Sequence, residues 1–100
     1  MSLEAVTEKI RQKFAYAGSV NARILFDFDE DGKLFIDATQ SPPVMTNEEA
    51  EADVTLVTSV DTLDKILDGR QDPNLAFMMG KLKVRGSMGL AMKLNGILEG

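Results

Sequence analysis

The chain has 100 residues, of which 44% are hydrophobic, and acidic side chains outnumber basic ones to give a net charge of −5. This length predicts a single domain over residues 1–100, because two hydrophobic cores could hardly be built from so little chain. The absence of cysteine and histidine excludes disulfides, structural zinc and every mechanism that needs a thiolate or an imidazole. Overall acidity argues against nucleic-acid binding. No apolar run approaches the roughly 18 residues that cross a bilayer, so we expect a soluble, cytoplasmic protein.

The first predicted element is a helix over residues 4–17. Its apolar residues recur at spacings of three and four, which places them on one stripe. They are Leu3, Val6, Ile10, Phe14 and Ala17. Ser2 is a candidate N-cap, and Gly18 is a candidate stop.

Residues 22–38 then alternate with a period of two, which predicts a β-hairpin. One face carries Ile24, Phe26, Phe28, Leu34, Ile36 and Ala38. Leu25 falls on the other face among charged residues. Asp31-Gly32 between the two segments predicts the turn, because both residues tolerate positive φ. The acids from Asp27 to Asp31 imitate the start of a calcium-binding EF-hand loop, but its twelfth position is Ala38 and not glutamate, so a turn with solvated acids is expected.

The middle of the chain predicts a break, two strands and a helix. Ser41-Pro42-Pro43 interrupts the sheet. A short strand over 44–46, an acidic loop over 47–52 and a strand over 53–58 follow. The next helix carries an apolar stripe, begins after the N-cap Ser59 and stops at Gly69.

The C-terminal part predicts a short helix, a strand and a final helix. Asp72 is the N-cap and Pro73 the first residue of the short helix, which ends before Gly80. Residues 81–85 form the last strand, with Leu82 and Val84 facing inward. The final helix runs from a cap at Ser87 to about residue 98. Short connections between the early strands favour an antiparallel sheet, and the helices must cover its apolar face.

The final helix has apolar residues in nearly every direction: Met88, Leu90, Ala91, Met92, Leu94, Ile97 and Leu98. Such a helix needs cover on most sides, which a bound lipid, a second subunit or a membrane can supply. Four of the six methionines lie in this region (Met78, Met79, Met88 and Met92). A flexible thioether suits a pocket for ligands of varied length, although ordinary core filling is the simpler interpretation.

Charge is distributed unevenly along the chain. Residues 1–68 have six basic and fourteen acidic side chains, a balance of −8, whereas residues 69–100 have five basic and two acidic ones, a balance of +3. Lys81, Lys83 and Arg85 can meet an anionic headgroup or a membrane surface. The period-two alternation of a strand with a solvated face explains the same residues more simply.

Candidates for catalysis are few. The aspartates lie on or beside a tight turn, where water keeps carboxylates ordinary, and the serines have no histidine to activate them. We therefore expect no enzymatic activity, no cofactor and no metal.

Residues 72–94, DPNLAFMMGKLKVRGSMGLAMKL, resemble the sterol carrier protein type two family. The matching residues are Asn74, Ala76, Phe77, Gly80, Lys81, Leu82, Lys83, Gly86, Met88, Gly89, Leu90, Ala91, Met92, Lys93 and Leu94. Asp72-Pro73 stands where the family has Asn-Pro. Ala52-Asp53 with Thr55, and the helix from Asp61 to Gly69, also resemble the family's middle section.

The resemblance implies an α/β (α+β) fold: a five-stranded, mostly antiparallel sheet covered on one face by helices and enclosing an apolar tunnel. The tunnel holds a fatty acid, acyl-CoA, phospholipid or sterol-like lipid without chemistry, each buried CH₂ contributing about 0.8 kcal/mol. Facing pattern and family analogy assign its lining to Ile24, Phe26, Leu34, Ile36, Leu56, Phe77, Leu82, Val84, Met88, Leu90, Met92 and Leu94. Arg23, Lys81, Arg85 and Lys93 are the headgroup candidates.

Two readings of the function follow. The first is a lipid carrier, with transient membrane contact. The second is a dimerising or substrate-presenting module for an enzyme that acts on hydrophobic substrates. Animal members of the family end in a peroxisomal tripeptide, which this sequence lacks. We therefore expect a stand-alone prokaryotic member, and the sequence does not identify its lipid.

Overall fold

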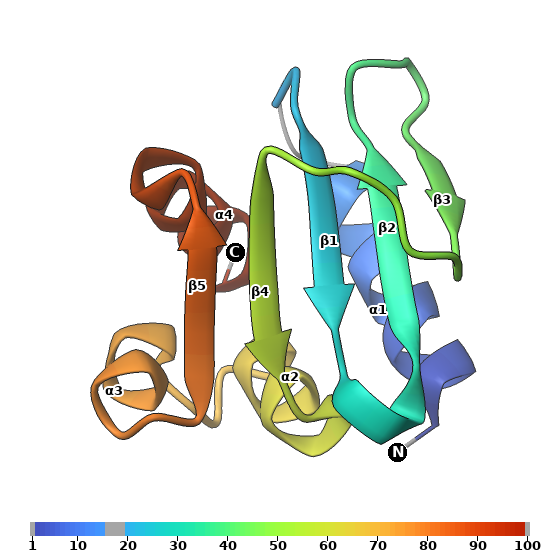
Figure 1. Cartoon of the computed structure of the whole chain (residues 1–100). Helices are drawn as coiled ribbons and strands as arrows, with labels where there is room; N and C mark the ends of the chain where they lie inside the picture. Colours follow the sequence, from blue (N-terminus) through green and yellow to red (C-terminus); the bar gives the residue numbers. More distant parts are fainter. Residues whose placement is uncertain (1, 16–19, 100) are drawn as a thin grey trace.

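The computed structural model describes residues 2–15 and 20–99, and Figure 1 shows its arrangement. The described part contains α1 (Leu3–Ala15), β1 (Arg23–Asp27), the short 3₁₀ helix η1 (Asp29–Asp31), β2 (Lys33–Asp37), β3 (Val44–Thr46), β4 (Val54–Thr58), α2 (Val60–Leu67), α3 (Pro73–Met78), β5 (Leu82–Gly86) and α4 (Met88–Glu99). The order of elements confirms the one that the sequence predicts. Helix α1 is described as far as Ala15, and the predicted positions Ala17 and Gly18 lie outside the described residues.

The strands form one sheet in the order β3-β2-β1-β4-β5. Strands β1 and β4 are parallel, and the other neighbouring pairs are antiparallel. The expected five-stranded, mostly antiparallel sheet is therefore confirmed. The register places Ile24 opposite both Ile36 and Val54, so apolar residues of neighbouring strands share one face.

Polar side chains begin the helices as the sequence predicts. Ser2 Oγ accepts from the backbone N–H of Ala5, and Ser59 Oγ from that of Thr62. Asp72 Oδ1 accepts from Asn74 N, and Ser87 Oγ from Leu90 N. Each cap satisfies a backbone donor that has no partner within its helix.

The β1–β2 connection is longer than a two-residue turn at Asp31-Gly32. The last strand pair is Asp27 opposite Lys33, and η1 fills the space between them. Asp29 and Gly32 have positive φ angles of 54° and 110°, whereas Asp31, which the sequence predicts to have one, does not. The N–H of Phe28 donates to the carbonyl of Gly32 at 2.9 Å. The extra residues let Phe28 turn back into the core, where it is 2% exposed.

Leu25 is more buried than its predicted position among charged residues implies, with only 6% of its surface exposed. Its cross-strand partners on that outer face are Phe35 and Thr55. The chain that leaves β3 crosses the same face before it enters β4 (Figure 1). Asp53 anchors this connection, because its carboxylate and its N–H both bond to the backbone of Arg23 at 2.9 Å.

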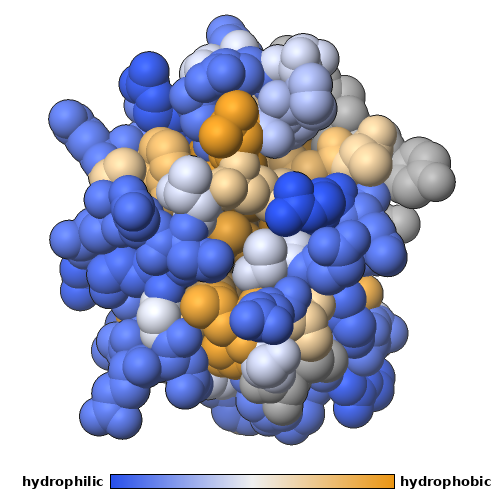
Figure 2. Space-filling model, turned by 90° about the vertical axis from the view of Figure 1, so that its right-hand side faces the viewer, coloured by the Kyte–Doolittle hydropathy of each residue, from blue (hydrophilic) through white to orange (hydrophobic). Residues whose placement is uncertain are grey.

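Helices α1, α2 and α4 lie on the opposite face of the sheet, behind it in Figure 1. The hydrophobic core is the layer between them and the strands. Its margin reaches the surface beside β3, where Figure 2 shows a band of hydrophobic side chains between hydrophilic ones. Leu3 and Met45 are partly buried against the core. None of the helices in the described ranges is long and apolar enough to cross a membrane.

Candidate functional site

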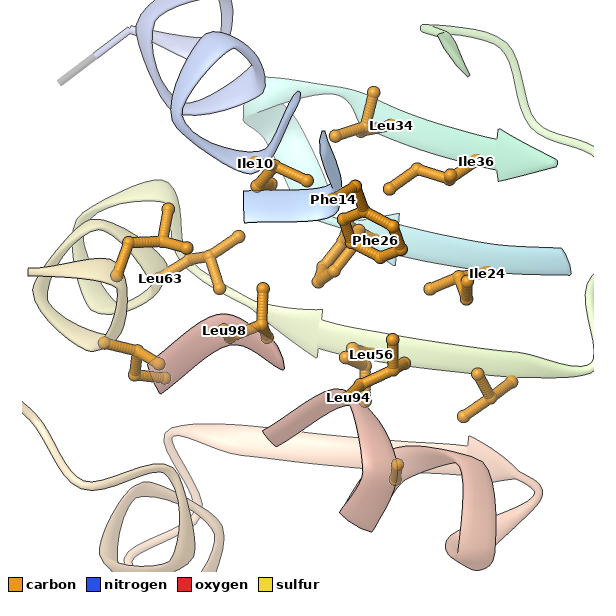
Figure 3. Packing of buried hydrophobic residues seen from close by; sticks show 14 of the residues in the cluster. Ile10, Phe14, Ile24, Phe26, Leu34, Ile36, Leu56, Leu63, Leu94 and Leu98 are labelled. Carbon is orange, nitrogen blue, oxygen red and sulfur yellow. The ribbon is translucent and has the colours of Figure 1, made fainter. Parts of the chain in front are cut away.

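The sheet–helix interface gathers seven of the twelve predicted lipid-binding residues. They are Ile24, Phe26, Leu34, Ile36, Leu56, Leu82 and Leu94, all between 0% and 5% exposed. Figure 3 shows six of them turned toward one interior from β1, β2, β4 and α4. These side chains are almost completely covered by other protein atoms, and the apolar tunnel that the resemblance implies stays a prediction.

The interior is almost free of polar groups. The buried polar or charged residues of the described chain are Thr58 and Asp64. The Thr58 hydroxyl donates to the carbonyl of Lys81 at 2.9 Å, and Asp64 is paired with Lys9 and Arg70. A layer with no unpaired buried side-chain donor or acceptor among the described residues can hold an apolar ligand but offers nothing to orient a polar one.

The five remaining predicted lining residues are more exposed than the seven interior ones, to different degrees. Val84 and Leu90 are partly buried against the core. Phe77, Met88 and Met92 are 45%, 49% and 70% exposed. The structure therefore divides the predicted set into an interior group and an outward-facing group at the C-terminal end.

The outward-facing group belongs to a larger apolar surface. Leu75, Met78 and Met79 are also exposed, by 50%, 78% and 63%. We call the set Leu75, Phe77, Met78, Met79, Met88 and Met92 the C-terminal apolar surface. The sequence assignment did not include Leu75, Met78 and Met79, although the run Phe77-Met78-Met79 at the end of a six-residue helix is too long to be buried on one face.

The interior also includes residues that the sequence assignment omitted: Val6, Ile10, Phe14, Leu63, Ile66 and Leu98. Ile10 and Phe14 of α1 approach Phe26 and Leu34 from the helix side, and Leu63 and Leu98 extend the same layer (Figure 3). The apolar stripe of α1 could have identified Val6, Ile10 and Phe14, because such a stripe requires a partner surface, and the stripe of α2 could have identified Leu63 and Ile66 in the same way.

The four headgroup candidates are spread over β1, α4, and β5 with the residue before it. Arg23 is on β1, where its Nε is 4.0 Å from Asp37 Oδ2. Arg85 is on the exposed side of β5 and Lys81 just precedes that strand, whereas Lys93 is exposed on α4. Thr39 and Gln40 donate hydrogen bonds that, with Arg23, hold the pKa of Asp37 below its ordinary value. Arg23 is thus part of a local polar cluster at the far end of β1.

An ion cluster joins α1 to α2. Lys9 Nζ lies 2.5 Å from Asp64 Oδ1 and 2.9 Å from Asp68 Oδ1. Arg70 contacts the other oxygens of both carboxylates at 3.3 and 3.1 Å. Hydrogen bonds to Asp64 and Asp68 raise the pKa of Lys9, and the hydrogen bond from Lys9 lowers that of Asp68. The cluster joins two of the three helices that cover the sheet.

The acidic η1 segment is a turn, as the sequence predicts, and it lies between two strands. Asp27 Oδ1 accepts from the backbone N–H of Asp29 at 2.9 Å and from Lys33 Nζ at 3.0 Å, and these bonds lower its pKa. An open hollow there is lined by Phe28, Asp29, Glu30, Asp31 and Ser59. Within residues 2–15 and 20–99, no group of three or more potential ligands is placed to hold a metal ion.

Comparison with known proteins gives the wider context. A curated relative, "Hydroxysteroid dehydrogenase-like protein 2" of Xenopus tropicalis, is 39% identical over 72 residues, which cover 70% of this chain and 17% of that protein. "Sterol carrier protein 2" of Bos taurus is 41% identical over 54 residues, 54% of this chain and 10% of that protein. The chain thus matches less than a fifth of the length of either relative.

A solved structure has the same fold. The solution structure of sterol carrier protein 2 from Aedes aegypti, described as a complex with C16 fatty acid (palmitate), superposes with a TM-score of 0.75. That match covers 98% of this chain and 96% of the other, at 20% identity. Residues 3–99 also match the sequence model of the SCP-2 sterol transfer family. The chain therefore belongs to the SCP-2 sterol transfer family.

Proposed function

We propose that the protein binds and carries one long-chain lipid, whose acyl chain lies between the sheet and α4. The observation that supports this most strongly is the apolar layer at the sheet–helix interface in a chain of this family. Family membership supports lipid binding or transfer as the general function. Whether the lipid is a fatty acid, an acyl-CoA, a phospholipid or a sterol-like molecule is a question for experiment.

Because at most 5% of the surface of each of the seven interior residues is exposed, a lipid placed among them must displace protein side chains. Helix α4 is the element best suited to move. Its inward residues Ala91, Leu94 and Leu98 hold it by apolar contact. Among its hydrogen bonds to other elements are those from Asn95 to Asn74 at 3.5 Å and from Ser87 N, just before its start, to Asp53 O at 3.1 Å. An acyl chain under α4 replaces one set of apolar contacts with another, at small net cost in hydrophobic burial.

Lipid extraction tests the carrier function. Gentle purification followed by solvent extraction and mass spectrometry is expected to find about one lipid per chain. Protein that carries none, and that after lipid removal fails to take up a fluorescent fatty acid, contradicts the proposal.

Charged substitutions test the position of the lipid. We expect Leu90→Asp to abolish fatty-acid uptake, because Leu90 is partly buried against the core and a carboxylate beside an acyl chain must lose its water. Met92→Asp should weaken uptake less, because Met92 is 70% exposed and its carboxylate keeps most of its water. Val44→Asp, which changes an exposed apolar residue on β3, is the matched control and should bind normally. Unchanged uptake by a folded Leu90→Asp protein would place the lipid elsewhere.

A second candidate function has its own support. The match to a dehydrogenase-like protein covers 17% of that protein, so similar domains occur as small parts of larger chains. A dimerising or substrate-presenting accessory module is the corresponding function. An empty protein that sediments as a stable dimer and displaces no fluorescent fatty acid would favour it.

A further inference from the structure

We propose that the C-terminal apolar surface, together with the basic residues Lys81, Lys83 and Arg85, docks on an anionic lipid bilayer. Among the residues that the structure describes, seven large hydrophobic side chains are exposed, and six of them belong to this surface. The seventh, Val44, is on β3 at the other edge of the sheet. Such a concentration of exposed apolar residues marks an interaction site.

The elements that carry this surface form one end of the molecule. Strand β5 is an edge of the sheet, and α3 and α4 both contact it. Figure 1 shows the two helices flanking β5 at the end away from β3. A hydrogen bond from Asn95 to Asn74 joins α4 to α3. The exposed apolar side chains therefore lie on neighbouring elements.

A line of basic side chains accompanies the apolar residues. Lys81, Lys83 and Arg85 alternate along β5 and its approach, and all three are exposed. Within the described chain none of the three forms a salt bridge, although the charge of Arg85 contributes to the lowered pKa of Asp27. Elsewhere most basic side chains are paired with acids: Lys9, Arg11, Arg23, Lys33, Lys65 and Arg70. Positive charge on this acidic protein is thus left without an ion-pair partner beside its exposed apolar side chains.

This combination fits an anionic bilayer better than a second copy of the chain. A two-fold dimer through this end would bring two identical basic lines together, with only Asp72 and Glu99 as acids in residues 69–100. At a bilayer the same charges meet anionic headgroups, while the methionines adapt to a fluid boundary. The charge of −8 on residues 1–68 also repels the rest of the molecule from that surface, so one orientation is favoured.

The docking does not depend on lipid carriage, because a protein with no interior ligand would present the same surface. Vesicle flotation measures it directly. The full chain is expected to float with vesicles of phosphatidylcholine containing about 30% phosphatidylglycerol, and to stay behind with phosphatidylcholine alone. Each basic side chain near the membrane is worth about fivefold in affinity, so the triple variant Lys81→Glu, Lys83→Glu, Arg85→Glu should lose at least about a hundredfold.

A matched variant controls for total charge. Arg11→Glu, Lys13→Glu, Lys65→Glu makes the same change in net charge on α1 and α2 and should keep most of the vesicle binding. Met78→Asp, Met79→Asp tests the apolar part and should also abolish flotation, since both side chains are exposed and their loss leaves the core intact.

The outcomes of these measurements distinguish docking on a bilayer from docking on a second copy of the chain. Loss of flotation in both surface variants, with retention in the control, supports the bilayer. Absence of binding to the anionic vesicles, equal loss in the control, or a wild-type dimer that Met78→Asp, Met79→Asp converts to monomer would overturn it. Fatty-acid uptake in solution should be unchanged by Met78→Asp, Met79→Asp, because neither residue belongs to the predicted lining and both are exposed, so a failure of docking is distinguishable from a failure of carriage.

Discussion

At the scale of single residues, the junction between β5 and α4 depends on one glycine. Gly86 has a φ of 92°, and a Cβ built on it would lie 2.5 Å from the carbonyl oxygen of Asp53. The same oxygen accepts the N–H of Ser87, the residue that caps α4. Gly86 therefore lets the edge strand turn into the last helix while both stay against β4.

Substitutions at three glycines distinguish the cost of a positive φ from the cost of a steric clash at Cβ. Gly86→Ala should destabilise the protein by about 3 kcal/mol, because left-handed φ and the clash with Asp53 add. Gly80→Ala, with φ of 77° and open space around it, should cost about 1–2 kcal/mol. Gly96→Ala, within α4 and facing open space, should stabilise by about 0.5–1 kcal/mol. Urea unfolding gives all three values, and a Gly86→Ala protein as stable as Gly80→Ala would contradict the account.

At the scale of elements, caps and alternation predict most of the architecture. Ser59, Asp72 and Ser87 act at the positions that the sequence assigns to them, because capping depends on local chemistry. The burial of Leu25 could not be predicted in the same way. It depends on a connection from β3 to β4 that crosses the outer face, which is a property of topology and not of local pattern.

The site was predictable to a similar extent. Alternation places Ile24, Phe26 and Leu34 in the interior, where the structure has them. Alternation cannot distinguish a residue that packs in the core from one that contacts a ligand, because both need the same apolar side chain. The exposure of Met78 and Met79 was predictable only in part: the run Phe77-Met78-Met79 after a short helix shows that some of the three must be exposed, but not which.

The ion cluster between α1 and α2 makes stability depend on pH. Asp68 has a lowered pKa because of Lys9, so its contribution is complete above the ordinary pKa of about 3.9 and is lost as the pH falls through the lower folded value. Lys9 has a raised pKa, so its contribution is lost only as the pH rises above about 10.5. The window of full stabilisation therefore includes neutral pH.

Lys9→Met tests this cluster. The variant should melt at a lower temperature than the parent at pH 7, and the difference should shrink toward pH 3. Arg11→Met, which removes an exposed pair with Glu8 on α1, should show a smaller effect at both values. An equal deficit for Lys9→Met at pH 7 and pH 3 would show that the loss is packing and not charge.

At the scale of the whole molecule, a ligand that binds only the folded chain must stabilise it. Free fatty acid at 100 times its Kd adds about 2.7 kcal/mol to the free energy of unfolding. For a domain of this size that raises Tm by about 10–20 °C. Differential scanning calorimetry of lipid-free protein with increasing palmitate checks the shift, and a Tm that does not depend on palmitate concentration would speak against an interior ligand.

If the apolar layer between sheet and helices holds an acyl chain through buried area alone, affinity must depend on chain length. Isothermal titration of lipid-free protein with laurate, myristate and palmitate, each below its micelle concentration, measures this dependence. We expect one saturable site, with affinity rising about 15-fold for each pair of added CH₂ groups. No saturable binding, or an affinity that stays constant along the series, would contradict it.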